Sequence, residues 1–328
     1  MREMPLNSVV RKDNRIYLKV GGDWYYYNLM SSPLGSGSMG TVYLGRSKSS
    51  GAKVAIKQVA ESIQNNPSIR SRARLEGSMK FCHHNLVEMI GYCEYDSVHS
   101  RGPIWIISKL VNGINLDYHV KHNLVVFKDS LYKIIETIYP VLEALIFLHA
   151  NGIFHLDIKP SNIMVENGSN IRLMDLGICS QGIASVVQNT GLLGTPQFAA
   201  PEQFHSEDQD NPINATTDIY QVGITLYQLL TNKNPFLAPT IHECMNLHNT
   251  TTLPYCKEVP NEIVDVLRKA TNPKQSLRYQ TADEFRNALK SAVFEVKNKP
   301  FKRRRLIIGA SIISIIILLF VIILFLQR

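Results

Sequence analysis

Side chains suited to phosphate chemistry gather in one short stretch in the middle of the chain. The stretch HLDIKPSN contains Asp157, Lys159 and Asn162, and a DLG triplet begins further on at Asp175. Phosphoryl transfer needs a carboxylate that accepts the proton of an attacking hydroxyl, and further oxygen ligands that hold Mg²⁺ on the phosphates. Asp157 suits the first role, and Asn162 and Asp175 suit the second. Lys159 can neutralise charge on the transferred phosphoryl group.

A glycine-rich loop and a lysine-bearing strand lie nearer the N-terminus. Gly35, Gly37 and Gly40 form a G-x-G-x-x-G pattern, and a β-branched, aromatic stretch follows it. That context predicts a hairpin between strands rather than the strand-to-helix turn of a dinucleotide site. Glycines let the backbone approach phosphate oxygens closely. The strand from Val54 ends in Lys57, a point charge for phosphates. Taken alone, the glycine pattern is equally typical of an ordinary glycine hairpin, and Lys57 is equally typical of a surface lysine.

Together and in this order, the motifs resemble the signature set of the protein kinase family over residues 29–293. The lysine two residues after Asp157 is similar to the catalytic loop of serine/threonine kinases. The run GTPQFAAPE, which contains Thr195 and Glu202, resembles the end of an activation segment. Arg278 resembles the arginine that pairs with that glutamate. The PEQ and DIYQ runs resemble bacterial, membrane-anchored members of the family.

The resemblance implies an α+β fold of two lobes, with a β-rich N-lobe, a helical C-lobe, and ATP and Mg²⁺ between them. It implies a hinge at Lys109, Leu110 and Val111, with the small Ser108 guarding the back of the site. The implied catalytic residues are Asp157, Lys159, Lys57 and Thr195, and the implied Mg²⁺ ligands are Asn162 and Asp175. The implied nucleotide-contacting residues are Leu34, Gly35, Ser36, Gly37, Ser38, Met39, Gly40, Val42, Ala55, Lys57, Glu76, Lys109 and Val111.

Three positions depart from the family pattern. Leu156 stands where many kinases have the arginine that receives an activation-loop phosphate, so we do not expect activation to require such phosphorylation. Thr190 is nevertheless a candidate autophosphorylation site. Leu176 replaces the usual phenylalanine, and because both are apolar, Mg²⁺ binding is expected to be unaffected.

The third departure concerns the glutamate that pairs with Lys57. Glu76 lies in a helical stretch, 68–80, but closer to the following HHN run than the family spacing requires, and without a gap Arg74 would take its place. A shortened helix with Glu76 as the partner is our prediction. The alternative is a solvated glutamate.

Periodicity predicts how the chain is organised around these residues. Strand signals fill residues 15–60, and Tyr17–Val20 with Trp24–Tyr27 form a predicted hairpin. Apolar residues at helical spacing predict helices over 131–148, 217–231 and 281–293, and Pro140 is expected to kink or split the first of these. The expected parts are an N-terminal extension with the hairpin (1–28), a kinase domain (29–293, lobes 29–110 and 111–293), a basic juxtamembrane linker (294–305) and a transmembrane helix (306–326).

The basic charge of the chain is concentrated in its C-terminal tail. The net charge is +8, and the seven cations of residues 297–328 leave +1 on the remainder, which gives no warrant for nucleic-acid binding. Residues 306–326 carry no charge, and a helix of that length spans about 30 Å. The basic residues before it place the kinase domain in the cytosol by the positive-inside rule. We therefore expect a single-pass C-terminal anchor in a bacterial plasma membrane. The five scattered cysteines form no C-x-x-C pair.

Three functions follow from these features. The first is a membrane-tethered protein serine/threonine kinase acting on protein substrates, for which tethering favours homodimers and autophosphorylation in trans. The second is a pseudokinase scaffold that binds ATP without turnover, favoured only by the spacing of Glu76. The third, a small-molecule kinase, is disfavoured because the segment from Thr195 to Glu202 resembles a protein-substrate platform.

Overall fold

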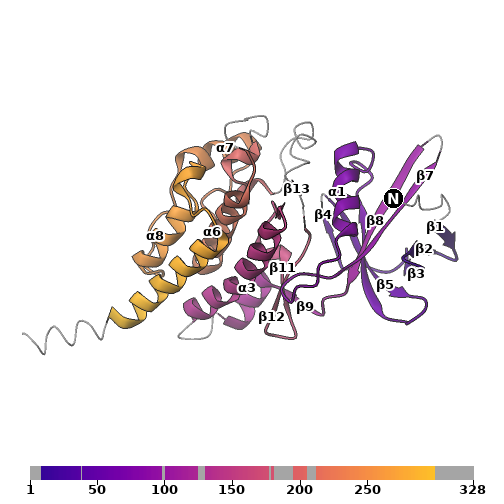
Figure 1. Ribbon diagram of the computed structural model, residues 1–328, viewed down its shortest axis with the longest axis horizontal. Coiled ribbons are helices and arrows are strands. Elements are labelled where there is room, and N and C mark those ends of the chain that lie inside the picture. Colours follow the sequence, from indigo (N-terminus) through magenta and orange to yellow (C-terminus); the bar gives the residue numbers. More distant parts are fainter. Residues whose placement is uncertain are drawn as a thin grey trace, which may run out of the picture.

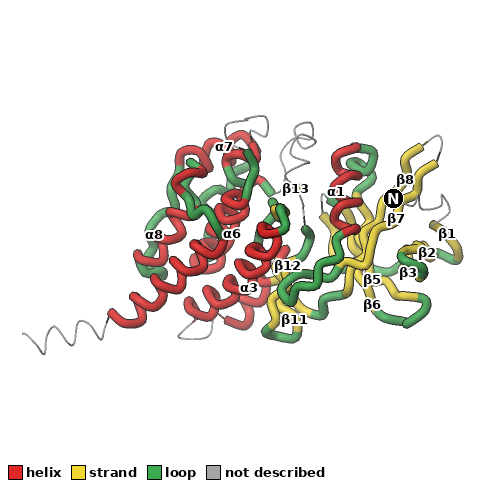
Figure 2. Tube along the Cα trace, in the orientation of Figure 1, coloured by secondary structure: helices red, strands yellow, loops and turns green. Residues whose placement is uncertain are grey.

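The chain folds into two lobes, one built of strands and one of helices (Figures 1 and 2). The computed structural model describes residues 9–37, 39–97, 100–124, 130–176, 179–180, 195–204 and 212–299. Within those ranges no helix is long and apolar enough to cross a membrane. Ser38, Thr190, the linker from residue 300 onward and the transmembrane prediction over 306–326 lie outside the described residues.

The N-lobe is an eight-stranded antiparallel sheet in the order β1-β2-β3-β5-β6-β8-β7, with β4 also paired to β5. Its one described helix, α1 (Pro67–Ser78), packs against β7 and β8. Asn66 caps that helix, because its side chain accepts from the backbone N–H of Ser68 at 2.9 Å. The strands are β1 (Val9–Lys12), β2 (Arg15–Val20), β3 (Asp23–Asn28), β4 (Gly35–Gly37), β5 (Gly40–Ser47), β6 (Lys53–Val59), β7 (Met89–Ser97) and β8 (Ser100–Lys109).

The predicted N-terminal hairpin is confirmed as β2 and β3, which pair from Arg15↔Asn28 to Val20↔Asp23. Its turn uses Gly21 and Gly22, whose φ angles of 57° and 90° suit glycine. The hairpin does not stand apart from the lobe, because β3 continues the sheet by pairing with β5. The sheet therefore begins at Val9, upstream of residue 29.

The hairpin buries one face in a core of its own. Along β2, Ile16, Leu18 and Val20 are buried while Arg15 and Lys19 are exposed, as the two-residue period of a strand requires. β2 also packs against β7 at the other edge of the sheet. A Cβ on Gly91 of β7 would lie 2.3 Å from a methyl group of Val20. The resulting apolar cluster comprises Ile16, Leu18, Val20, Tyr27, Val54, Ile56, Cys93, Trp105 and Ile107.

The C-lobe is built around α3 (Ser130–Ala150) and α6 (Ala215–Thr231), whose apolar faces share one large core. Both predicted helices are confirmed, and the third is found over 282–299. α3 is not split, since Pro140 lies inside one continuous helix. The other α-helices in the described part of this lobe are α2 (Leu116–His119), α5 (Pro201–Phe204), α7 (Ile241–Thr250) and α8 (Asn261–Ala270).

Short strands and turns bring the stretch HLDIKPSN (residues 155–162) to the border of the lobes. The strands β9 (Gly113–Asn115), β11 (Ile163–Glu166) and β12 (Asn170–Leu173) form a three-stranded sheet, and β10 (Ile153–Phe154) pairs with β13 (Cys179–Ser180). HLDIKPSN lies between β10 and β11, and Asp175 follows the end of β12 after one intervening residue. Residues far apart in the sequence therefore meet where the sheet lobe faces the helices.

Candidate active site

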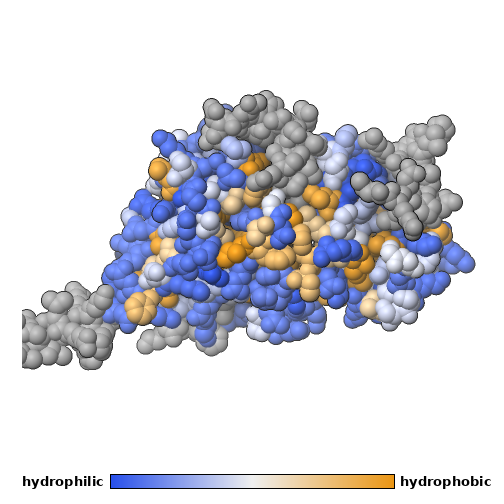
Figure 3. All heavy atoms as spheres, viewed as in Figure 1, coloured by the Kyte–Doolittle hydropathy of each residue, from blue (hydrophilic) through white to orange (hydrophobic). Residues whose placement is uncertain are grey.

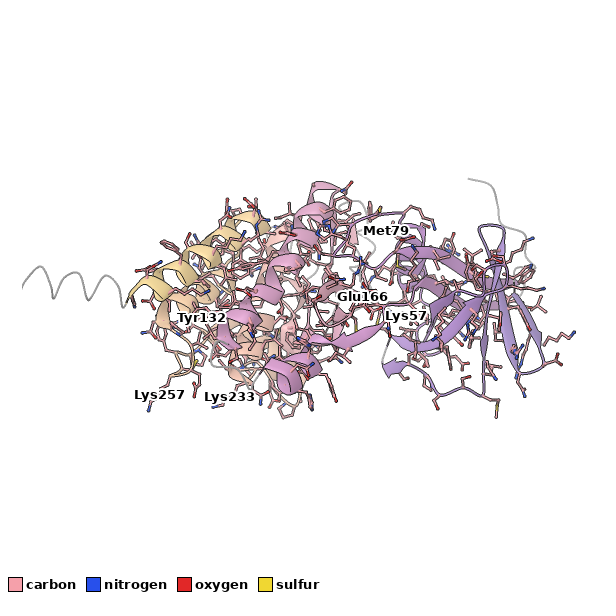
Figure 4. The ribbon with its side chains drawn as sticks, turned by 90° about the horizontal axis from the view of Figure 1, so that it is seen from below. Lys57, Met79, Tyr132, Glu166, Lys233 and Lys257 are labelled. Carbon is pink, nitrogen blue, oxygen red and sulfur yellow. The ribbon has the colours of Figure 1, made fainter. Side chains whose placement is uncertain are left out.

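Two adjoining cavities, of about 510 and 580 Å³, lie between the lobes. Both are lined by Gly35, Val42, Lys57, Glu76 and Asp175, so they form one continuous cleft. On the face drawn in Figure 3, apolar residues gather in the middle of the molecule, between the two lobes. Figure 4 shows Lys57 at this border, on the side of the N-lobe that faces the C-lobe. The first cavity has the size of a small-molecule site.

The first cavity is mainly apolar, a character that suits a flat aromatic ring. The predicted residues Leu34, Val42, Ala55 and Val111 line it. Of the other predicted hinge residues, Leu110 lines the cavity as well, and Lys109 does not. The lysine ammonium instead pairs with Glu88 at 2.7 Å, and its side chain is 63% exposed.

The glycine-rich loop is the hairpin that the sequence predicted. β4 and β5 pair from Gly35↔Val42 to Gly37↔Gly40. Gly40 has a φ of 147°, and a Cβ there would lie 2.1 Å from the carbonyl oxygen of Gln58, so only glycine fits. Ser36 and Met39 line the second cavity, and Ser38 lies outside the described residues. The loop therefore lines the N-lobe side of the cleft, and at its glycines only backbone atoms face the cavity.

Lys57 reaches across the cleft from β6 to Asp175. The ammonium nitrogen lies 2.9 Å from Oδ1 of that carboxylate. Burial lowers the pKa of Lys57, but the charges of Asp175, Glu76 and Asp157 outweigh it, so the pKa lies above its ordinary value. Lys57 in turn holds the pKa of Asp175 below its usual range. The pair is ionised, and it places one cation and one anion where phosphates and a metal would meet.

Glu76, and not Arg74, faces this site. Arg74 turns toward β7, where its guanidinium binds Glu94 at 2.9 Å. Arg70, 2% exposed, binds the same carboxylate at 2.6 Å. Glu76 is buried and lines both cavities. Among the described residues it forms no ion pair within 4.0 Å, although its charge acts on Lys57.

Burial raises the pKa of Glu76 to about 7, and the neighbouring Lys57 opposes this rise. The carboxyl group therefore titrates close to neutral pH. A change of its charge would act on Lys57 and Asp175 directly.

Asp157 is held by four hydrogen bonds. Its Oδ1 accepts from the backbone N–H and the hydroxyl of Thr195, at 3.1 and 3.0 Å. Its Oδ2 accepts from Lys159 at 2.8 Å and from Asn162 at 3.0 Å. The ammonium of Lys159 also donates to the Thr195 hydroxyl at 2.6 Å. The structure thus brings together all four residues that the sequence proposed here, and the bonds fix the orientation of the carboxylate.

The stretch HLDIKPSN is bound by side chains of α6. Both oxygens of Asp218 accept backbone N–H groups, from His155 at 2.9 Å and from Leu156 at 2.8 Å. Gln221 accepts the N–H of Ile158 at 2.9 Å. Leu156 has a φ of 64°, a strained value for a bulky residue, so the surrounding contacts must impose it. Its side chain is buried in a small apolar cluster and offers a phosphate no charge.

Glu202 and Arg278 form a buried ion pair beneath this segment. Two hydrogen bonds of 2.7 and 2.9 Å join the guanidinium to the carboxylate, and both side chains are at most 2% exposed. Burial opposes ionisation of Glu202, but its bonds to Arg278 and Thr217 outweigh that effect and lower its pKa. The pair ties α5 to the turn before the last helix.

Asn162 and Asp175 fit a Mg²⁺ site by their chemistry and position. Both line the second cavity, and both carry oxygen atoms of the kind that Mg²⁺ prefers. The amide nitrogen of Asn162 is bound to Asp157, at its carbonyl and its carboxylate, which leaves the amide oxygen for a cation. The described residues contain no group of three His, Cys, Asp or Glu side chains arranged for a metal. Two ligands suffice where phosphates supply the others.

The sequence analysis did not predict two methionines and one arginine that line the cleft. Met164 and Met174 line the first cavity, and Arg72 of α1 lines the second. Met174 could have been found, because it immediately precedes Asp175. Met164 could have been inferred from the alternation of β11, in which Ile163 and Val165 are buried and Met164 is not.

Comparison with solved structures identifies the fold. The kinase domain of PknI from Mycobacterium tuberculosis superposes with a TM-score of 0.61 and 21% sequence identity. The match covers 84% of this chain and 98% of that domain. The architecture is therefore the two-lobed protein-kinase fold.

The sequence identifies the family. A profile of the protein kinase domain matches residues 29–293, so the chain belongs to the protein kinase family. The serine/threonine-protein kinase PknB of Mycobacterium leprae is 31% identical over 266 residues, covering 77% of this chain and 41% of the relative. A probable serine/threonine-protein kinase PknB of Corynebacterium glutamicum is 32% identical over 215 residues, covering 63% and 32%. The chain thus spans well under half the length of these relatives.

Proposed function

We propose that the chain is an ATP- and Mg²⁺-dependent protein serine/threonine kinase. The observation that carries the proposal is the orientation of Asp157 by Thr195, Lys159 and Asn162, opposite the Lys57–Asp175 pair. Kinship with bacterial serine/threonine kinases supports the choice of hydroxyl substrates over other acceptors.

The geometry suits each residue to one step. ATP would place its adenine in the apolar cavity and its phosphates under the glycine loop, against Lys57. Asp157 would orient a serine or threonine hydroxyl and accept its proton as the oxygen attacks the γ-phosphorus. Lys159 would offset charge on the transferred group. Mg²⁺, held by Asn162 and Asp175, would neutralise the phosphate oxygens when bound.

We further propose that residues 306–326 tether the kinase domain to a membrane, with the domain in the cytosol. The uncharged stretch and the basic residues before it support this, and a bacterial plasma membrane fits the kinship of the domain. Confinement to a membrane raises the effective concentration of the kinase near membrane-bound protein substrates and near copies of itself. Homodimers and autophosphorylation in trans follow naturally from that arrangement.

The decisive experiment measures transfer from labelled ATP with Mg²⁺, using the full chain in a mild detergent. A generic protein substrate and the chain itself serve as acceptors. Asp157→Asn and Asp175→Ala serve as controls, and both should abolish incorporation. If the wild-type chain binds ATP but transfers no phosphate, the kinase proposal fails and the pseudokinase scaffold replaces it. The position of Glu76 would then be the first feature to test as the cause of the missing activity.

The tether has its own test. The full chain should pellet with membranes after salt and carbonate washes, whereas residues 1–299 should stay in the supernatant and retain transfer activity. If the washes release the full chain from the membrane, the anchor is refuted and the kinase proposal is unaffected.

A further inference from the structure

His248 lies beneath the segment that follows Thr195 and is completely buried. It belongs to the last part of α7, and none of its side chain is exposed. Its ring stacks on Phe236 at 4.3 Å with an angle of 10° between the planes. A second aromatic ring, that of Phe204 in α5, lies 5.5 Å away. A polar ring in such surroundings needs hydrogen-bond partners for both nitrogens.

Both nitrogens have such partners. Nε2 lies 2.9 Å from the carbonyl oxygen of Pro196, and Nδ1 lies 2.8 Å from the hydroxyl of Tyr220. Because a carbonyl only accepts, Nε2 must carry the proton and donate it. In the neutral ring, Nδ1 accepts from the Tyr220 hydroxyl. Burial lowers the pKa of His248 to about 4, which agrees with that state.

The bond to Pro196 acts on the residue that orients the catalytic carboxylate. Pro196 directly follows Thr195, whose backbone N–H and hydroxyl both bind Asp157. The same carbonyl accepts the N–H of Ala199 and thereby closes the 3-10 turn Pro196–Phe198. His248 therefore links α6 and α7, through one backbone oxygen, to the start of the segment that meets a protein substrate.

We propose that His248 is a positioning residue that holds the segment 195–198 in place for protein-substrate binding and for the orientation of Asp157. The inference rests on the proposed kinase function. It assigns His248 no contact with ATP, because the cavities that would hold the nucleotide are not lined by it. The protein-substrate side of the reaction should therefore depend on His248, and the ATP side should not.

Two substitutions of His248 separate the hydrogen bond from packing. His248→Phe keeps a flat ring against Phe236 but removes the donor to Pro196. His248→Gln keeps an N–H donor within reach of that carbonyl. His242→Phe makes the same change at an exposed position of α7 and serves as the matched control. Tyr220→Phe removes the partner of Nδ1 but leaves the Nε2–H donor to Pro196 in place.

The measurement is steady-state phosphorylation by the full chain in detergent, with the protein substrate and ATP varied separately. His248→Phe should lower kcat/KM for the protein substrate about 10- to 100-fold, the loss typical of a displacement near 1 Å. The KM for ATP should stay unchanged, and His248→Gln should retain most of the wild-type kcat/KM. The His242→Phe value should match the wild type.

Three results would overturn the assignment. They are an unchanged kcat/KM in a folded His248→Phe variant, an equal loss in the Phe and Gln variants, or a rise in the KM for ATP. If His248→Phe does not fold, His248→Gln and Tyr220→Phe decide: both keep an N–H donor to Pro196, so both should retain most of the wild-type kcat/KM, and a large loss in either folded variant would overturn the assignment. A wild-type chain without transfer would instead refute the kinase proposal, which keeps the two failures distinct.

Discussion

Replacing Leu18 by alanine should destabilise the N-lobe, although Leu18 lies upstream of the region that matches the family profile. Its side chain is 0% exposed and belongs to the apolar cluster that β2 and β3 share with β6, β7 and β8. Truncating a fully buried leucine removes its contacts and leaves a cavity, which costs about 2–5 kcal/mol. At about 2–4 °C per kcal/mol, the melting temperature should fall by roughly 4–20 °C.

Intrinsic fluorescence is a suitable assay, because both tryptophans of the chain, Trp24 and Trp105, lie in this sheet. Urea unfolding of residues 1–299 would compare the wild type with Leu18→Ala and with Lys19→Ala. Lys19 is the neighbouring, exposed residue of β2, and its truncation should change stability by less than about 0.5 kcal/mol. Equal midpoints for the two variants would show that the hairpin is a loosely attached extension, and the reasoning would be refuted.

Three other substitutions test the charged groups. Glu202→Gln breaks the buried pair with Arg278 and should cost about 3–5 kcal/mol in thermal unfolding at neutral pH. Because the pKa of Glu202 is lowered, this difference should shrink as the pH falls below about 4.5, and a constant difference would contradict it. Glu94→Gln leaves Arg70 buried without its carboxylate and should cost about 2–3 kcal/mol; an unchanged urea midpoint would contradict that. The pKa of Glu76 is raised to about 7, so ionisation of this carboxyl group opposes folding. Relative to Glu76→Gln, the wild type should therefore lose stability as the pH rises from about 4.5 to 7. Parallel pH profiles of stability for the two proteins would contradict this prediction.

Local pattern was enough to predict most of the fold. The hairpin, the glycine loop between strands and the three helices depend on residues close in sequence, and all were found where periodicity placed them. The attachment of the hairpin was not predictable in this way. It depends on β3 meeting β5 and on β2 packing against β7, and no local period specifies which distant strand a hairpin edge will meet.

The candidate site also has features that were predictable from local sequence and features that were not. Asp157, Lys159 and Asn162 share one stretch, so their proximity could be predicted, and the resemblance supplied Thr195. The direction of a single side chain could not be predicted. Lys109 lies in the expected hinge but turns outward, because Glu88 of the neighbouring loop offers it a partner.

The position of Glu76 shows how a tertiary contact can settle an ambiguity that spacing leaves open. Glu76 and Arg74 are two residues apart on α1, so they point about 200° apart around the helix and cannot both face the cleft. The carboxylate of Glu94 on β7 binds Arg74. The same carboxylate also binds the buried Arg70, which lies one turn earlier on the same side of α1. Two ion pairs to one carboxylate fix the rotation of α1, and that rotation leaves Glu76 facing Lys57. Glu94 therefore helps to select Glu76 as the residue that faces Lys57, and it lies on β7, outside every motif that the sequence displays.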